Sequence, residues 1–138
     1  MSQDHPDGVD WVMTNPPFSH AAQFIQKGLR VARRGVAMLL RVAFLEGTER
    51  YSVLYEGESP LTLVAPFVER VSMVLGTYDP DAGLATCNAW FFFRKGRGKR
   101  PIELLPIPPG TKARLYRPED ARRFAKLAEA PLLEFVNT

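Results

Sequence analysis

The spacing of apolar and polar positions predicts alternating strands and helices in the first part of the chain. Residues 9 to 13 form a short apolar run with one acid, followed by prolines that cannot continue a strand ladder. Over residues 19 to 34 apolar side chains recur at helical spacing, with Ser19 placed to cap the start and Gly35 to follow the end. Residues 36 to 42 are almost continuously apolar, as in a parallel strand that helices cover on both faces. The pattern predicts a strand-helix-strand unit.

Turn residues and aromatic residues predict the elements that follow. Residues 86 to 95, "TCNAWFFFRK", are rich in aromatic side chains and predict a last core strand, in which Trp90 to Phe93 alternate as packed core residues. The other predicted elements are a short helix at 48 to 56 starting at a capping Thr48, an extended segment at 61 to 75 broken near Pro66, a turn at 78 to 83, a short edge strand at 102 to 105 and a helix from Pro118 to about Ala130.

Length and composition predict one domain over residues 1 to 138, because 138 residues of which 46% are hydrophobic can bury one sizeable core. No apolar run is long enough to span a bilayer and no apolar leader opens the chain, which favours a cytoplasmic protein without membrane contact. The lone Cys87 lies in an apolar segment and is expected to be buried, and His5 and His20 lack ligand spacing, so no metal site is predicted.

The stretch Asn15-Pro16-Pro17-Phe18 directly follows the first predicted strand. Two prolines hold the backbone before them in an extended elbow, and the carboxyl end of a parallel strand is where open α/β sheets bind ligands. The Asn15 carboxamide and the Pro16 carbonyl can accept hydrogen bonds from a substrate amino group, while Phe18 offers a flat face to a planar base or amide. Such a grip suits alkylation of an amino nitrogen. The alternative is a simple turn, which asparagine before proline commonly starts.

The stretch "DWVMTNPPF" resembles the Asn-Pro-Pro-aromatic signature of class I S-adenosylmethionine-dependent amino methyltransferases, especially the N6-adenine DNA methyltransferases. Residues 35 to 47 and 88 to 96 resemble the next strand and the terminal aromatic strand of a subgroup often carried by phages, so the resemblance covers about residues 9 to 96. It implies an α/β fold: a partial Rossmann-like sheet of parallel strands with an antiparallel aromatic C-terminal strand, followed by a basic loop and a helix over about residues 97 to 138.

The same resemblance assigns roles to the motif. Asn15 and the Pro16 carbonyl would hold the target amino group, Pro17 would complete the rigid elbow, and Phe18 would stack on a base flipped out of a duplex. DNA is therefore the expected substrate. Protein-glutamine and RNA-guanine methyltransferases carry similar motifs, so RNA and protein remain alternatives.

The cofactor of that family is S-adenosylmethionine, held by a glycine-rich loop and an acidic residue that both precede the signature. Only fourteen residues precede Asn15, and the one Gly-x-Gly, Gly96-Arg97-Gly98, leads into basic residues and a proline, so no cofactor-binding residues are assigned. We therefore expect the C-terminal half of a methyltransferase, with the family's fourth to seventh strands. The alternative function is a non-catalytic remnant or accessory subunit that self-associates or binds nucleic acid.

Charge and strand position predict the partners. A formal net charge of +3 fits contact with a polyanion, and Arg41 is expected nearer the motif, where it would pair with Glu46 or stay exposed. The strand at residues 9 to 13 would become a sheet edge without its neighbours, so we expect it to pair with a second copy or with a separate cofactor half. The basic group that either follows a phosphate backbone or forms a solvated hairpin is Arg94, Lys95, Arg97, Lys99 and Arg100.

Overall fold

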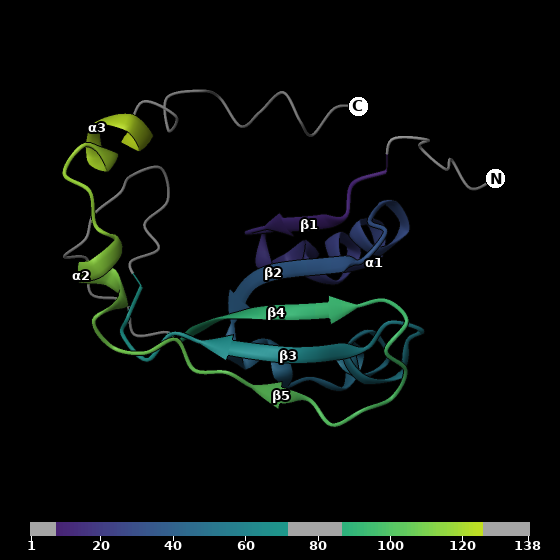
Figure 1. Ribbon diagram of the computed structural model, residues 1–138. Coiled ribbons are helices and arrows are strands. Elements are labelled where there is room, and N and C mark those ends of the chain that lie inside the picture. Colours follow the sequence, from purple (N-terminus) through teal and green to yellow (C-terminus); the bar gives the residue numbers. More distant parts are fainter. Residues whose placement is uncertain (1–7, 72–86, 126–138) are drawn as a thin grey trace.

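The computed structural model describes residues 8–71 and 87–125, and its centre is an open five-stranded mixed sheet (Figure 1). The strand order is β1-β2-β4-β3-β5. β1 and β2 are parallel, β3 and β5 are parallel, and β4 runs antiparallel to both of its neighbours. An α/β fold with an antiparallel aromatic strand is thus confirmed. The strands are β1 (Trp11–Thr14), β2 (Gly35–Arg41), β3 (Leu61–Pro66), β4 (Asn88–Arg94) and β5 (Glu103–Leu104).

The predicted strand-helix-strand unit is present, with α1 (Ala21–Val31) joining β1 to its parallel neighbour β2. The predicted ends of the helix are wrong. Ser19 belongs to a 3-10 helix, Phe18–His20, and its hydroxyl contacts the His20 ring instead of capping α1. The helix ends at Val31, and Gly35 is the first residue of β2. The turn after the prolines already gives the His20 amide an acceptor, so a side-chain cap is not needed there.

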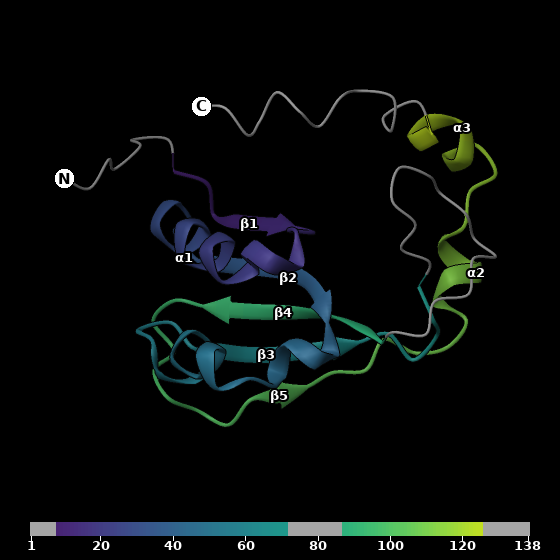
Figure 2. The same ribbon diagram turned by 180° about the vertical axis from the view of Figure 1, so that it is seen from behind.

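One face of the sheet carries the core. α1 and the helical turns between β2 and β3 lie on this same face (Figure 2). Those turns are 3-10 helices at Val42–Leu45 and Thr48–Arg50 and a π-helix at Ser52–Glu56, so the predicted short helix exists in irregular form, with Gly47 instead of Thr48 at its cap position. The largest fully buried side chains are Phe91, Phe93, Ile25, Met38, Leu40, Leu54, Leu61 and Val36.

Two glycines allow the close packing of this unit. A Cβ atom at Gly28 would lie 2.8 Å from Val36 Cγ1, and one at Gly35 would lie 2.3 Å from the Phe93 carbonyl oxygen. Real Cβ atoms do not approach backbone that closely, so Gly35 is required where β2 meets β4, and Gly28 lets α1 lie directly on the sheet.

The C-terminal helices are short and lie beyond the sheet end at which β1, β2 and β3 finish (Figure 1). They are α2 (Thr111–Leu115), which was not predicted, and α3 (Asp120–Ala125), which begins two residues after the predicted Pro118. The Glu69 carboxylate accepts hydrogen bonds from the amides of Gly110 and Lys112 and ties α2 to the end of β3. The turn at 78 to 83 and residues 126 to 130 lie outside the described residues.

Other predictions have mixed outcomes. The break after Pro66 and the short edge strand β5 are confirmed. The expectation that Cys87 is buried is wrong: it precedes β4 on the exposed end of the sheet. Within the described ranges, no helix combines the length and apolar character that crossing a membrane requires.

Candidate functional site

The Asn15-Pro16-Pro17-Phe18 elbow lies where β1 ends, at the sheet end that we call the carboxyl edge, where Thr14, Arg41 and Pro66 close β1, β2 and β3. Pro17 is extended, with φ −56° and ψ 132°, and the chain then turns into the helix. Pro16 is buried, whereas Asn15 is exposed. The buried proline fixes the elbow to the domain, and the carboxamide is left at the surface.

The hydrogen bonds of the elbow leave two acceptors open. The Pro17 carbonyl accepts a hydrogen bond from the His20 amide at 3.0 Å, which starts the helix. By contrast, the Pro16 carbonyl and the Asn15 carboxamide have no hydrogen-bond partner in the described part of the chain. These are the two groups that were predicted from the sequence to hold an amino group. The Asn15 carboxamide belongs to an exposed residue and is available to a ligand, whereas the Pro16 carbonyl belongs to a buried residue.

Phe18 and Arg41 meet at this edge. The guanidinium carbon of Arg41 lies 4.5 Å from the centre of the Phe18 ring, a cation–π contact between the end of β2 and the elbow after β1. Phe18 itself is 38% exposed. Arg41 is therefore near the motif, as expected. Neither of the two described ion pairs joins it to Glu46.

Asn88 is a residue at this edge that the sequence did not single out. Asn88 is the first residue of β4, lies opposite Arg41 in the register and is only 3% exposed. Its side-chain amide nitrogen, Nδ2, has no hydrogen-bond partner among the described residues. A buried amide without a partner costs on the order of 1–3 kcal/mol, so it is an exception within a folded domain. The one available signal was a polar residue at the head of an aromatic run.

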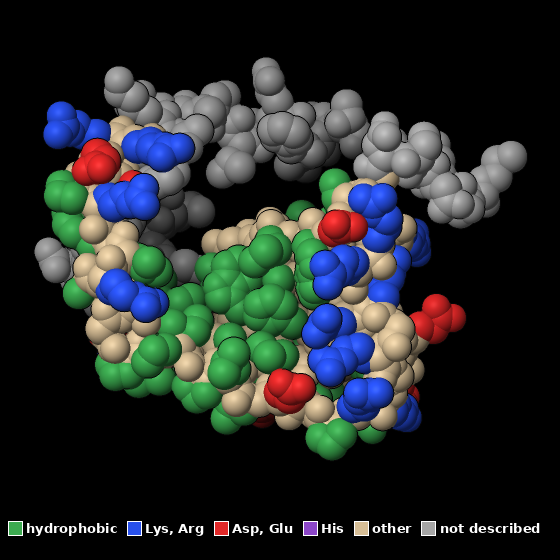
Figure 3. Space-filling view, in the orientation of Figure 1, with side chains coloured by type: hydrophobic (Ala, Val, Ile, Leu, Met, Phe, Trp, Pro, Cys, Tyr) green, Lys and Arg blue, Asp and Glu red, His purple; other side chains and the backbone are tan. Residues whose placement is uncertain are grey.

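The basic group lies at the opposite end of the sheet, which we call the amino edge. Arg94 stands beside Gly35 in the register, whereas Arg41 ends β2 six residues later. A strand of that length spans roughly 20 Å, so the group and the motif are separate. The Lys95 amide bonds to the Arg34 carbonyl at 2.9 Å, which adds the α1–β2 loop to this edge. Blue side chains gather there in Figure 3.

The residues of the basic group stand near few acids. Arg97 lies 4.0 Å from Glu103, and on the neighbouring loop Arg33 pairs with Asp10 at 3.1 Å. The described ion pairs include neither Lys99 nor Arg100. The group therefore keeps a positive field that suits phosphate contacts, and both of the readings made from sequence stay open.

The aromatic strand divides between the two faces of the sheet. Phe91 and Phe93 are fully buried in the core, and Phe44 meets Phe91 edge-to-face at 6.0 Å. Trp90 and Phe92 alternate to the other face and are only partly buried. The expected alternation is confirmed, but only half of these rings belong to the core.

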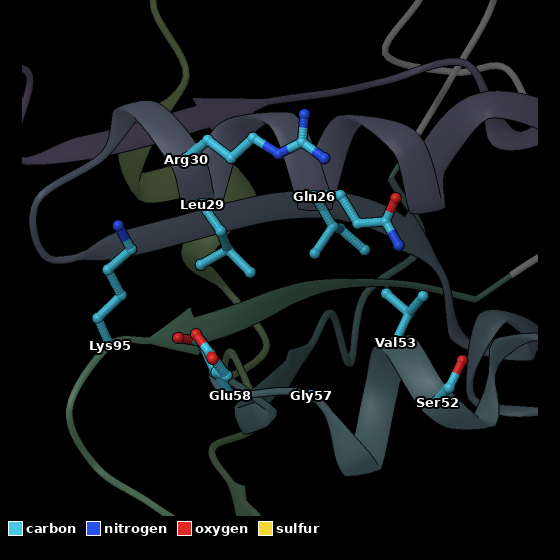
Figure 4. Close-up of a pocket in the computed structure, with 10 residues that line it drawn as sticks. Gln26, Leu29, Arg30, Ser52, Val53, Gly57, Glu58 and Lys95 are labelled. Atoms are coloured by element: carbon cyan, nitrogen blue, oxygen red, sulfur yellow. The ribbon is translucent and has the colours of Figure 1, made fainter. Parts of the chain in front are cut away.

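The largest of four described pockets, about 610 Å³, lies between α1 and the Ser52–Glu56 helix (Figure 4). Leu29 and Val53 approach it from opposite sides, and Arg30 and Lys95 lie at its margin. The motif lines none of these four pockets. In the described part of the chain, Asn15 lies exposed at the end of β1.

The described residues contain no group of three or more His, Cys, Asp or Glu side chains arranged to hold a metal ion.

The glycines of the Gly96-Arg97-Gly98 stretch have positive φ and link β4 to β5, so no helix follows that could present its N-terminus to a cofactor. This stretch therefore lacks the strand-loop-helix arrangement of a glycine-rich nucleotide-binding loop. No family model, curated protein or solved structure matches the chain.

Proposed function

We propose that the Asn15 elbow is the amino-acceptor half of an N6-adenine methyltransferase-like site, on a partial Rossmann-like sheet. One observation carries the proposal: an asparagine carboxamide stands at the carboxyl end of a parallel strand, beside a proline carbonyl and an exposed aromatic ring. Neither the carboxamide nor the carbonyl has a hydrogen-bond partner among the described residues. The strand-helix-strand unit and the antiparallel aromatic β4 also agree with what the motif resemblance implies.

The residues of this chain would act by holding and orienting the acceptor. The Asn15 oxygen and the Pro16 carbonyl accept the two N–H bonds of an adenine amino group, which fixes the direction of the nitrogen lone pair. Both acceptors also stabilise positive charge that develops on that nitrogen. Phe18 stacks on the base, and the Arg41 guanidinium that now lies on the ring is placed to reach a neighbouring phosphate. No residue of the described chain is assigned to the methyl donor.

The acceptor site is tested by titrating adenosine and purine riboside, which lacks the amino group, into ¹⁵N-labelled protein. We expect adenosine to shift the side-chain amide signals of Asn15 and to bind more tightly. Asn15→Ala should weaken adenosine binding about three- to tenfold, the worth of one hydrogen bond, whereas Asn15→Asp keeps an acceptor and should retain binding. Equal affinity for both nucleosides, or an unaltered affinity in Asn15→Ala, would contradict the assignment.

A second candidate is a non-catalytic accessory subunit that keeps the fold. It is favoured by the Gly96 to Gly98 geometry, which leaves the described residues without a loop that suits the cofactor. Calorimetric titration with S-adenosylmethionine and its demethylated product separates the candidates. Saturable micromolar binding by the lone chain would exclude the accessory-subunit function. If no heat of binding is measured, the accessory subunit remains a candidate. The adenosine titration above then still tests the acceptor site.

Nucleic acid, with DNA first, is the proposed substrate class. The motif and the basic group are about 20 Å apart, which is about six base pairs of duplex, so one DNA segment could contact both edges. Replacing Arg97 and Lys99 by alanine should then reduce the slope of log affinity against log salt by about two. A slope that stays unchanged would identify the basic group as a solvated hairpin.

We also propose that β1 pairs with another polypeptide, either a second copy or a cofactor-binding half. β1 is an edge strand of the described sheet, and Met13 on it is 58% exposed. Exposed apolar edges invite pairing. Light scattering at high protein concentration is the test, and a strict monomer contradicts the homodimer.

A further inference from the structure

The face of the sheet opposite α1 has no helix over it among the described residues (Figures 1 and 2). Figure 3 shows this open face as a broad hydrophobic area at the centre of the molecule. Its centre is aromatic: the Trp11 and Phe92 rings meet edge-to-face at 6.3 Å, and Trp90 lies two residues from Phe92 on β4. The residues that line the groove on this face are Trp11, Thr62, Leu63, Ala65, Trp90, Phe92, Arg94, Arg97, Glu103, Leu105 and Ile107.

The groove has a volume of about 380 Å³ and an uneven charge. Its floor is formed by side chains of β3 and β4, and one wall is the segment that contains Leu105 and Ile107. Arg94 and Arg97 stand at its amino-edge end, where the only acid in the lining is Glu103. Glu103 lies 4.0 Å from Arg97, so Arg94 is left without a carboxylate among the described ion pairs. The groove is therefore apolar along its length and positive at one end.

We propose that this groove binds an amphipathic helix of a partner polypeptide, with carboxylates that meet Arg94 and Arg97. β3 and β4, which form the floor, are an antiparallel pair, and such a pair commonly turns polar side chains to solvent on an uncovered face. This floor is instead aromatic and aliphatic, and a helix is a usual cover for an apolar sheet face. Trp, Phe and Arg side chains around an apolar centre are also the composition of protein interfaces. The docking does not depend on the Asn15 site, and it is distinct from pairing along the β1 edge. It uses Arg94 and Arg97, so it would compete with the phosphate contacts proposed above for the basic group.

The dimensions fit a helix of two to three turns. Trp90 and Arg94 are four residues apart on β4, a span of about 13 Å, which a helix covers in about nine residues. Such a helix would present apolar residues at i, i+3, i+4 and i+7 to the groove.

A single-stranded nucleic acid is the competing occupant, because aromatic side chains and arginines also build stacking platforms. Two features favour the helix. Trp11 and Phe92 pack edge-to-face and so do not both offer a flat surface, and aliphatic side chains line much of the groove.

The test uses the full chain and two fluorescein-labelled peptides of about 14 residues with leucines at helical spacing. One peptide carries glutamates beside its apolar stripe and the other carries lysines. We expect the glutamate peptide to bind saturably in the micromolar range and the lysine peptide to bind at least about tenfold more weakly. Arg94→Glu with Arg97→Glu should reverse that preference. Arg114→Glu with Arg117→Glu, an equal charge change on and just after α2, should leave it unchanged.

Circular dichroism shows whether each variant is folded. If the double reversal does not fold, Arg94→Gln with Arg97→Gln is used, which should reduce the preference for the glutamate peptide without reversing it. Binding of neither peptide, equal binding of both, or reversal by the α2 variant overturns the proposal. So does tighter binding of an oligothymidylate that is lost in Trp90→Ala, because the face would then belong to nucleic acid.

Discussion

Strand β4 presents similar aromatic residues to two different environments. Phe91 and Phe93 lie on the face that α1 and the turns between β2 and β3 cover, and both are fully buried. Trp90 and Phe92, one position away in each case, lie on the open face and stay partly accessible. The residue types on the two faces are similar, so they do not explain the difference in burial. The difference arises because α1 and the helical turns cover only one face. The covered face should therefore carry the stability of the domain, and the open face and the sheet edges should be free to carry its interactions.

The largest expected effect is the loss of Phe91. Phe91→Ala empties a fully buried site against Phe44 and should lower the free energy of unfolding by about 3–5 kcal/mol. The matched change, Phe92→Ala on the open face, should cost about 1–2 kcal/mol, because that ring is partly exposed and its loss leaves no enclosed cavity. The cost includes the lost contact with Trp11. Urea denaturation of the two variants measures the difference. Equal losses would mean that the open face is part of the core.

The next effect concerns the close contact between β2 and β4 at Gly35. Gly35→Ala places a Cβ atom 2.3 Å from the Phe93 carbonyl oxygen and 2.9 Å from the Trp11 ring, so backbone must move. We expect a loss of about 3 kcal/mol. Gly98→Ala is the control: its φ of +62° is strained for alanine, but no atom lies within 4 Å, so about 1 kcal/mol is expected. A smaller loss at Gly35 than at Gly98 would contradict the close contact between β2 and β4.

Local sequence predicted the first part of the fold well. The apolar run at 36 to 42 and the helical spacing before it are strong signals. β1, α1 and β2 are all present, and the two strands are parallel. The helix ends were missed because the hydrogen bond between the Pro17 carbonyl and the His20 amide replaces the expected serine cap. α2 was missed because Glu69, some forty residues earlier, holds its start, and no local pattern reports such a contact.

The candidate site was predicted only in part, for a similar reason. The elbow could be found because proline acts on its immediate neighbours. The contact of Arg41 with Phe18 and the place of Asn88 depend on the strand order β1-β2-β4, which joins residues far apart in sequence. The antiparallel direction of β4 carries the basic group to the opposite edge. The motif resemblance implied that direction, but the aromatic run alone does not indicate it.

A smaller effect is expected at the carboxyl edge, in the contact between Arg41 and Phe18. Arg41→Ala removes a partly exposed cation–π pair and should lower the free energy of unfolding by about 0.5–1 kcal/mol. Arg41→Lys keeps a cation but loses the planar contact, so about half of that loss is expected. Phe18→Leu in the Arg41→Ala background should add little if the pair acts as a unit, which a double-mutant cycle measures. Additive losses would show that the two residues act independently.

The smallest effect on stability is expected at Asn15. Its carboxamide is exposed and has no protein partner among the described residues, so Asn15→Ala should change the free energy of unfolding by no more than about 0.5 kcal/mol. The extended elbow should persist, because Pro16 and Pro17 set it. A loss above about 1 kcal/mol in urea denaturation would instead mean that the side chain supports the fold. The same variant is expected to weaken adenosine binding. If its free energy of unfolding is unchanged while its affinity for adenosine falls, Asn15 acts in ligand binding, whereas Phe91 acts in the stability of the core.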